Sequence, residues 1–292
     1  MQSSVSVVVP AKDRAHLLER SLASVAAQRL APVEVVVVDD GSTDDTAGVA
    51  RRCGATVIRL DVNEGIGRAR NHGIRAATGE WIAFLDSDDE WSPGHLERLV
   101  ARAGSHVLVA APAISTSGRV LGNPYDHDVP LTSTSVLAPG DLVVTSGAMA
   151  RRSALLEAGL FRPLPRAEDL DMWVRLLSLG TGLATGEVTV TYNEHAEQSI
   201  HDRELMRRCV EDVIAEAAGG ALPAAADVDR ARSRLVWDDL RSAQRGGDVR
   251  GAARHGAWLL RRPHTWRPLA DVLRLRRESR QGGAAQRAAV LP

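Results

Sequence analysis

Strand and helix patterns alternate over the first ninety residues, and this alternation constrains the fold more than any other feature. Residues 33–38 are rich in valine, as in a strand that is covered on both faces. Within residues 14–28, Leu18, Leu22 and Val25 recur at a helical period. The order predicts an α/β fold with a mostly parallel sheet, right-handed crossovers and helices on both faces. The strands are expected at 5–9, 33–38, 56–60 and 81–85, and the helices at 14–28, 43–53 and 66–77.

The pattern becomes mixed after about residue 105 and purely helical from about residue 205. We therefore predict one large domain at 1–204, in two halves that meet near residue 110, and a helical extension at 205–292. The last ten or so residues are small and polar enough to be disordered. Further strands are expected at 106–114, 142–145 and 187–192, and a further helix at 167–179.

Composition and charge exclude some classes of protein. The formal net charge of -1 gives no reason to expect a nucleic-acid partner. Two distant cysteines, Cys53 and Cys209, have no metal-ligand spacing and suit a reduced thiol pair. The N-terminus has no signal-peptide pattern, and no apolar run approaches the ~18 residues that span a bilayer. We expect a cytoplasmic protein, with membrane-surface contact left open.

The strongest candidate site is Asp86-Ser87-Asp88-Asp89, directly after the strand expected at 81–85. Ligands of parallel sheets bind beyond the carboxyl ends of the strands. Carboxylates in this position suit hard cations such as Mg²⁺ or Mn²⁺, which accept oxygen ligands and phosphate. The alternative is a solvated acidic turn that caps the next helix.

A second candidate follows the second strand, where Asp39 and Asp40 precede Gly41 and Ser42. Acids at this position commonly accept hydrogen bonds from a ribose or a base. The alternative is a turn closed by Gly41, with Asp40 or Ser42 as a helix cap. Both interpretations can hold together, because one acid suffices for the cap.

A third candidate is the glycine-rich segment 63–71, which opens the helix expected at 66–77. Glycines such as Gly65 let the backbone approach a ligand at a helix N-terminus, where free N–H groups favour anions. Arg68 or Arg70 would neutralise phosphate charge. A plain turn is the alternative.

Together these motifs resemble the ordered motif set of the family-2 glycosyltransferases with the GT-A fold, which has a Rossmann-like sheet. The similarity rests on Val-Val-Val-Pro10, Asp39-Asp40-Gly-Ser42, Asn63-Glu-Gly65 and Phe-Leu-Asp86-Ser-Asp88-Asp89. It continues through 146–153, 159–161 and 168–176, and covers roughly residues 3–200. The resemblance implies an inverting transfer from a nucleotide-diphosphate sugar, of the UDP or dTDP type, to an unidentified hydroxyl acceptor.

The resemblance also implies roles for donor-binding and metal-binding residues. The donor site would include Pro10, Lys12, Asp13, Asn63, Gly65 and Arg70. Asp39 or Asp40 would bind the base and ribose, and Asp86, with Ser87 beside it, would face the ribose. Asp88 would ligate Mn²⁺ or Mg²⁺ between the donor phosphates, as a Lewis acid for the leaving diphosphate.

The acceptor-side segments resemble the family in two further places. Asp169 would be the general base that removes the acceptor hydroxyl proton, with Glu168 as the alternative base. A stabilising acid in the first turn of a helix is the other interpretation of Asp169. His195 would reach the metal or the diphosphate, or lie on the surface. Asn193 stands where the family commonly has an arginine.

Other classes of protein fit less well. A dinucleotide-binding oxidoreductase would carry Gly-x-Gly-x-x-Gly after the first strand, and residues 10–15 contain no glycine. A nucleotidyltransferase would open with a glycine-rich basic loop, which is also missing. A nucleotide-sugar-binding protein of the same fold, without transfer activity, remains an alternative.

The C-terminal extension is basic. From Ala226 onward it holds 15 arginines against 7 acids. Such helices either contact an anionic bilayer or pack as a cap on the catalytic domain with a solvated arginine face.

Overall fold

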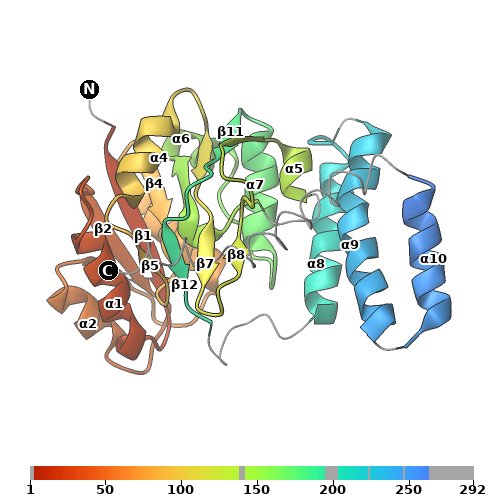
Figure 1. The fold of residues 1–292 in the computed structure, drawn as a ribbon. Coiled ribbons are helices and arrows are strands. Elements are labelled where there is room, and N and C mark those ends of the chain that lie inside the picture. The colour runs from red at the N-terminus through yellow and green to blue at the C-terminus, as the bar shows by residue number, and fades with distance from the viewer. Residues whose placement is uncertain (1–2, 138–141, 195–202, 223, 246, 263–292) are drawn as a thin grey trace.

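An eight-stranded sheet forms the centre of the molecule (Figure 1). The computed structural model describes residues 3–137, 142–194, 203–222, 224–245 and 247–262. Short apolar segments build this sheet, and its strands at 5–11, 81–84 and 108–110 are buried along their whole length. In spatial order the strands are β3 (Thr56–Arg59), β2 (Glu34–Asp39), β1 (Val5–Ala11), β4 (Trp81–Phe84), β10 (Ala148–Arg151), β6 (Leu108–Ala110), β11 (Gly182–Ala184) and β9 (Val129–Leu131).

The first four strands of the chain are all parallel, which confirms the predicted α/β fold. β1 pairs with β2 and β4 in parallel, and β2 pairs with β3 in parallel. β10 runs antiparallel to both of its neighbours, β4 and β6. A second, smaller sheet packs beside the first and consists of β5 (Glu90–Trp91), β12 (Val190–Tyr192), β7 (Ala113–Ser115) and β8 (Val120–Leu121).

Helices cover both faces of the large sheet. Alternate residues of β1 therefore belong to two different hydrophobic cores. Val7 and Val9 pack in the cluster that includes Leu18, Leu22 and Val25 of α1. Val8 packs in the other cluster, with Ile74 of α3 and Trp173 of α7. The helices of this part are α1 (Ala15–Ala26), α2 (Thr46–Arg52), α3 (Ile66–Ala76), α4 (His95–Ala103), α5 (Ser133–Leu137), α6 (Arg152–Glu157) and α7 (Glu168–Leu177).

Three local predictions were wrong. The strand expected at 106–114 is two strands, β6 and β7, which lie in different sheets on either side of Pro112. Residues 142–145 form no strand, because the chain pairs only from Ala148, after the 3-10 helix η1 (Thr145–Gly147). Ser42 is not a helix cap, since α2 begins after Asp45 and the Ser42 hydroxyl accepts from the Asp13 N–H.

Three helices follow the sheets, namely α8 (Arg203–Ala217), α9 (Ala225–Arg245) and α10 (Val249–Leu260). α8 packs on α7, and α9 packs on α5 and α8. α10 packs on α9 and lies at the end of the molecule farthest from β2 and β3 (Figure 1). No helix among the described residues is long and apolar enough to span a bilayer. The predicted disorder of the last ten residues falls outside the described part.

Candidate functional site

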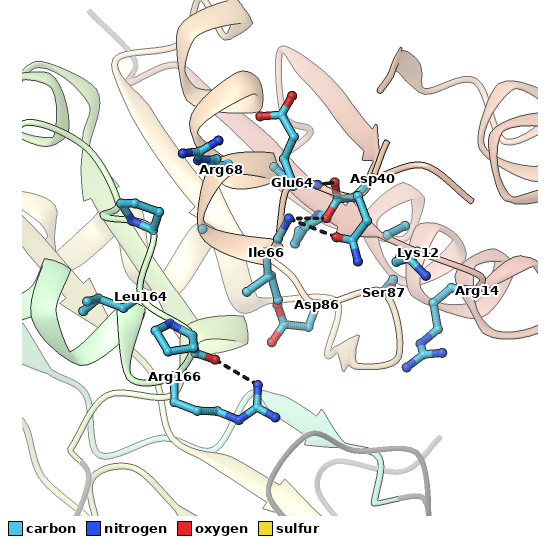
Figure 2. Close-up of a pocket in the computed structure, with 18 of the residues that line it drawn as sticks. Lys12, Arg14, Asp40, Glu64, Ile66, Arg68, Asp86, Ser87, Leu164 and Arg166 are labelled. Atoms are coloured by element: carbon cyan, nitrogen blue, oxygen red, sulfur yellow. Dashed lines mark hydrogen bonds between the residues drawn. The ribbon is translucent and has the colours of Figure 1, made fainter. Parts of the chain in front are cut away.

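A cavity of about 560 Å³ opens at the carboxyl ends of β1, β2 and β4. The strand ends and the start of α3 form one side, and the segment 163–166 forms the other (Figure 2). Acidic and basic side chains from the strand ends and from α3 line this space, and Arg166 lines it from the other side. The predicted site residues that line it are Pro10, Lys12, Asp40, Asn63, Gly65, Asp86, Ser87 and Asp88.

Other predicted residues lie away from the cavity lining. Asp39 and Arg70 are almost fully buried behind it. Asp13, Glu168 and Asp169 do not line it either. His195 lies outside the described residues, so its predicted role at a metal or diphosphate stays a prediction.

Asp40 shapes the loop that leads into α3. Its carboxylate accepts hydrogen bonds from the backbone N–H groups of Glu64, at 2.6 Å, and Gly65, at 2.9 Å (Figure 2). The amide oxygen of Asn63 accepts from the same Gly65 N–H at 3.0 Å. Gly65 has a φ of +93°, which L side chains rarely adopt. A glycine is therefore required at this turn.

Asp39 stabilises the turn that follows β2. Its Oδ1 accepts from the Ser42 N–H at 2.9 Å, and its Oδ2 lies 3.6 Å from Arg59 Nε. Of the two adjacent acids, only Asp40 lines the cavity. The sequence left open which of the two faces the ligand, and the structure favours Asp40.

The first turn of α3 lines the cavity. Gly65, Ile66, Gly67 and Arg68 are all lining residues, and Gly65 is the residue before the helix begins. The first N–H groups of a helix have no partner within the helix, and the helix dipole adds positive potential there. This end of α3 suits an anionic group such as phosphate.

Arg70 links Asp86, which lines the cavity, to Glu168 of α7. Its guanidinium donates to Asp86 Oδ1 at 2.9 Å and to Glu168 Oε1 at 2.8 Å, while only 2% of its side chain is exposed. Burial opposes the charged guanidinium, but Asp86 and Glu168 outweigh it and raise the pKa of Arg70. The prediction that Arg70 neutralises a donor phosphate does not fit this placement, because its charge is already taken up by two carboxylates.

Glu168 is held in the same arrangement. Burial, together with the neighbouring charge of Asp169, raises the pKa of Glu168, and Arg70 opposes that shift. The Glu168 carboxylate is thus engaged by Arg70.

Asp169 is oriented by a hydroxyl group. Thr145 Oγ1 donates to Asp169 Oδ2 at 2.9 Å, and the Leu170 N–H donates to Asp169 Oδ1 at 2.7 Å. Both oxygens of the carboxylate thus accept hydrogen bonds that fix the side chain. Asp169 lies in the first turn of α7, so its helix-stabilising interpretation holds beside any catalytic one.

Asp89 has no exposed surface and supports the loop from behind. The Ser146 hydroxyl donates to its Oδ2 at 2.5 Å, and the Asn193 N–H donates to its Oδ1 at 3.0 Å. Burial and the nearby Asp86 raise the pKa of Asp89 well above its usual range. The Asn193 side chain also donates to the Asp88 backbone carbonyl, at 2.6 Å. Asn193, where the family commonly has an arginine, therefore braces the acidic loop.

Lys12 and Asp13 form an ion pair with each other, 3.0 Å apart. Asp13 also accepts from the Thr43 N–H at 2.7 Å, and this hydrogen bond is the main cause that lowers the pKa of Asp13. Its φ of +52° marks a tight turn after β1. Asp13 thus joins the loops that follow β1 and β2, and Lys12 is the member of the pair that borders the cavity.

Sequence reasoning assigned no role to four charged or aromatic lining residues, which are Arg14, Glu64, Arg166 and Tyr192, although Glu64 lies within the candidate segment 63–71. Arg166 belongs to the segment Pro163-Leu-Pro-Arg166, which forms the side of the cavity opposite α3 (Figure 2). Its two prolines were a usable signal, because proline fixes φ and excludes the segment from a helix interior. Nothing local indicated that the segment would reach α3, about a hundred residues earlier.

Comparison with known proteins agrees with the resemblance that the sequence motifs indicated. The glycosyl transferase family 2 pattern matches residues 6–155. Succinoglycan biosynthesis protein ExoU of Rhizobium meliloti (strain 1021) is 34% identical over 183 residues, which are 58% of this chain and 50% of that protein. ExoO from the same strain is 43% identical over 124 residues, 40% of this chain and 36% of ExoO. The chain thus spans half or less of these two relatives.

Solved structures share the fold. The structure of S. aureus TarS 1-349 in complex with UDP-GlcNAc superposes with a TM-score of 0.69 and 20% sequence identity. The match covers 93% of this chain and 81% of that one. The likeness therefore extends over nearly the whole chain and concerns the fold.

Proposed function

Since the chain belongs to glycosyl transferase family 2, we propose that it is an inverting, metal-assisted glycosyltransferase. Its donor is a UDP- or dTDP-type nucleotide-diphosphate sugar, and its acceptor is a hydroxyl group. Family membership supports transfer from a nucleotide sugar. The inversion, the metal and the residue roles are the finer parts of the proposal.

One observation carries the proposal: carboxylates and anion-binding groups face a single cavity. Asp86 and Asp88 follow the end of β4, and the first turn of α3 lines the same space. Arg68 and Arg166 add positive charge from opposite sides. A diphosphate needs both kinds of group, because a cation and N–H donors share its charge. TarS, with a related fold, was solved with UDP-GlcNAc, and this supports a uridine donor.

The residues present fit a hard divalent cation such as Mn²⁺ or Mg²⁺. Asp88 lines the cavity, and Asp86, which meets Arg70 through Oδ1, keeps 28% of its side chain exposed. No group of three His, Cys, Asp or Glu side chains among the described residues is arranged to hold a metal. A site of one or two carboxylates completed by phosphate oxygens is usual for Mg²⁺. When bound, the ion acts as a Lewis acid for the leaving diphosphate.

Asp169 is the proposed general base. The acceptor oxygen attacks the anomeric carbon, the bond from that carbon to the donor phosphate breaks, and the acceptor hydroxyl proton passes to the Asp169 carboxylate. A single displacement of this kind inverts the anomeric centre. Thr145 holds Asp169 by a hydrogen bond, and Arg70 keeps the neighbouring Glu168 engaged.

The experiment is a thermal-shift panel of nucleotide-diphosphate sugars with Mn²⁺, followed by an assay of nucleoside diphosphate release with the best donor. We expect one donor to stabilise the protein, slow release in its presence, and loss of release when EDTA is added. Release that persists in EDTA would overturn the metal assignment. Donor binding without release or transfer to any hydroxyl acceptor would favour a binding protein of the same fold.

A further inference from the structure

The positive charge of this chain is concentrated at its C-terminal end. Residues 249–292 contain ten arginines and two acids, a formal charge of +8, whereas the whole chain carries -1. The first 248 residues are therefore acidic, at -9. A separation of charge this strong orients the molecule in the electric field of a charged surface.

The described part of this basic end is α10, which packs on α9 through one side. Gly251 and Leu259 are buried on that side. The opposite side is exposed and carries Val249, Arg250, Ala253, Leu260 and Arg261. Arg254, also exposed, lies at its edge and borders a pocket with Glu204 of α8 and Asp239 of α9. These six residues of the C-terminal helix are here called the α10 face. Val249 is 78% exposed and Leu260 72%. Two large apolar side chains are thus exposed to solvent, one at each end of the helix.

The α10 face has the two components of an interfacial helix. At 3.6 residues per turn, Val249, Ala253 and Leu260 lie along one line of the helix, and Arg250, Arg254 and Arg261 along a neighbouring line. An apolar line beside an arginine line suits the boundary between lipid headgroups and acyl chains. Figure 1 shows α10 at the outer end of the molecule, beyond α8 and α9.

We propose that the α10 face docks this protein on an anionic lipid bilayer. Charge complementarity selects this occupant, because anionic leaflets attract basic helices and leave the acidic remainder of the chain facing water. A second copy fits poorly, since a two-fold contact of this face with itself would set arginine against arginine. α8 and α9 act differently: they pack on α7 and α5 and extend the catalytic core.

The test is co-sedimentation of the full chain with vesicles of phosphatidylcholine, alone or mixed with phosphatidylglycerol. We expect binding to the mixed vesicles only, weakened by salt as charge screening requires. Each arginine near an anionic surface contributes roughly a five-fold factor. The triple variant Arg250→Gln, Arg254→Gln, Arg261→Gln is therefore expected to bind on the order of 100-fold more weakly.

A matched triple variant, Arg29→Gln, Arg51→Gln, Arg75→Gln, removes the same charge from exposed sites elsewhere and is expected to bind like the unmodified chain. Equal weakening by both triple variants would overturn the proposal, because net charge alone would then explain binding. So would absence of binding to the mixed vesicles, or a dimer in light scattering that the α10 variant abolishes. The assay measures no sugar transfer, so its outcome is independent of the proposed function.

Discussion

The hydroxyl of Thr145 donates a hydrogen bond of 2.9 Å to Oδ2 of Asp169. Thr145 lies in η1, just before β10, so a residue outside the acidic motifs orients the proposed base. Hydrogen bonds to charged groups contribute about 1.5–3 kcal/mol. Their loss at a base changes transfer more than donor binding, which involves other residues.

We therefore expect Thr145→Val to lower kcat by about ten-fold, with the KM for the donor changed less than about two-fold. Thr145→Ser keeps the hydroxyl and is expected to retain most of the activity. Steady-state kinetics with saturating acceptor measure both constants. If Thr145→Ser were as slow as Thr145→Val, the hydroxyl would not be the cause.

Substitutions of Asp88 and of Asp169 are expected to impair the enzyme in different ways. Asp88→Asn removes a cavity carboxylate that we assign to the metal, so it is expected to weaken Mn²⁺-dependent donor binding in thermal-shift titrations. Asp169→Asn is expected to leave donor binding intact and to lower kcat by roughly 100- to 10,000-fold, the usual contribution of a general base. Identical binding curves for the two variants, with identical kinetics, would contradict this division.

Arg70 is expected to be a determinant of stability. Arg70→Met leaves Asp86 and Glu168 without their shared partner, and breaking a buried pair typically costs about 3 kcal/mol or more. Urea unfolding followed by circular dichroism measures the free energy of unfolding. The matched control Arg51→Met changes an exposed arginine of α2 and is expected to stay within about 0.5 kcal/mol. A small effect of Arg70→Met would show that the carboxylates find other partners.

His95 makes the stability of the fold sensitive to acid. It is fully buried, stacks on Trp91 at 4.4 Å between ring centroids, and its Nδ1 lies 2.7 Å from Thr189 Oγ1. Burial, with a smaller contribution from Arg98, lowers the pKa of His95 to about 3. The unfolded chain, with a histidine pKa near ~6.5, binds this proton first, so stability falls as the pH drops from about 6.5 toward 3.

Between pH 7 and pH 5, His95 is expected to remove about 2 kcal/mol of stability. His95→Gln lacks the titrating ring and is expected to lose that much less over the same interval. Urea unfolding of both proteins at the two pH values gives the comparison. Parallel losses would mean that other groups cause the acid sensitivity.

The first half of the fold was predictable from sequence because its signals are local. Valine-rich strands and helical periods such as Leu18, Leu22 and Val25 lie within single elements. The wrong predictions have long-range causes. Residues 106–114 read as one apolar strand, yet Pro112 lies where the chain passes from one sheet to the other.

The sequence likewise predicted some residues of the candidate site and not others. Residues at strand ends, such as Asp40, Asp86 and Asp88, do line one cavity, since parallel strands end at the same edge. Arg70 was assigned to a phosphate because it follows a glycine-rich helix start, where anions commonly bind. Its partner Glu168 lies 98 positions later, and no local pattern carries that information.

The acidic motif 86–89 divides its residues between two tasks. Asp86, Ser87 and Asp88 border the cavity, while Asp89 is buried among Ser146 and Asn193. Under the proposed function, engineering of cation or nucleotide preference would vary Ser87 and Asp88, because Arg70 holds Asp86 and the buried Asp89 keeps the loop in shape. In a library that randomised all four positions, most members are expected to lose the shape of the loop. An inactive Asp89 variant would therefore not test the proposed metal binding.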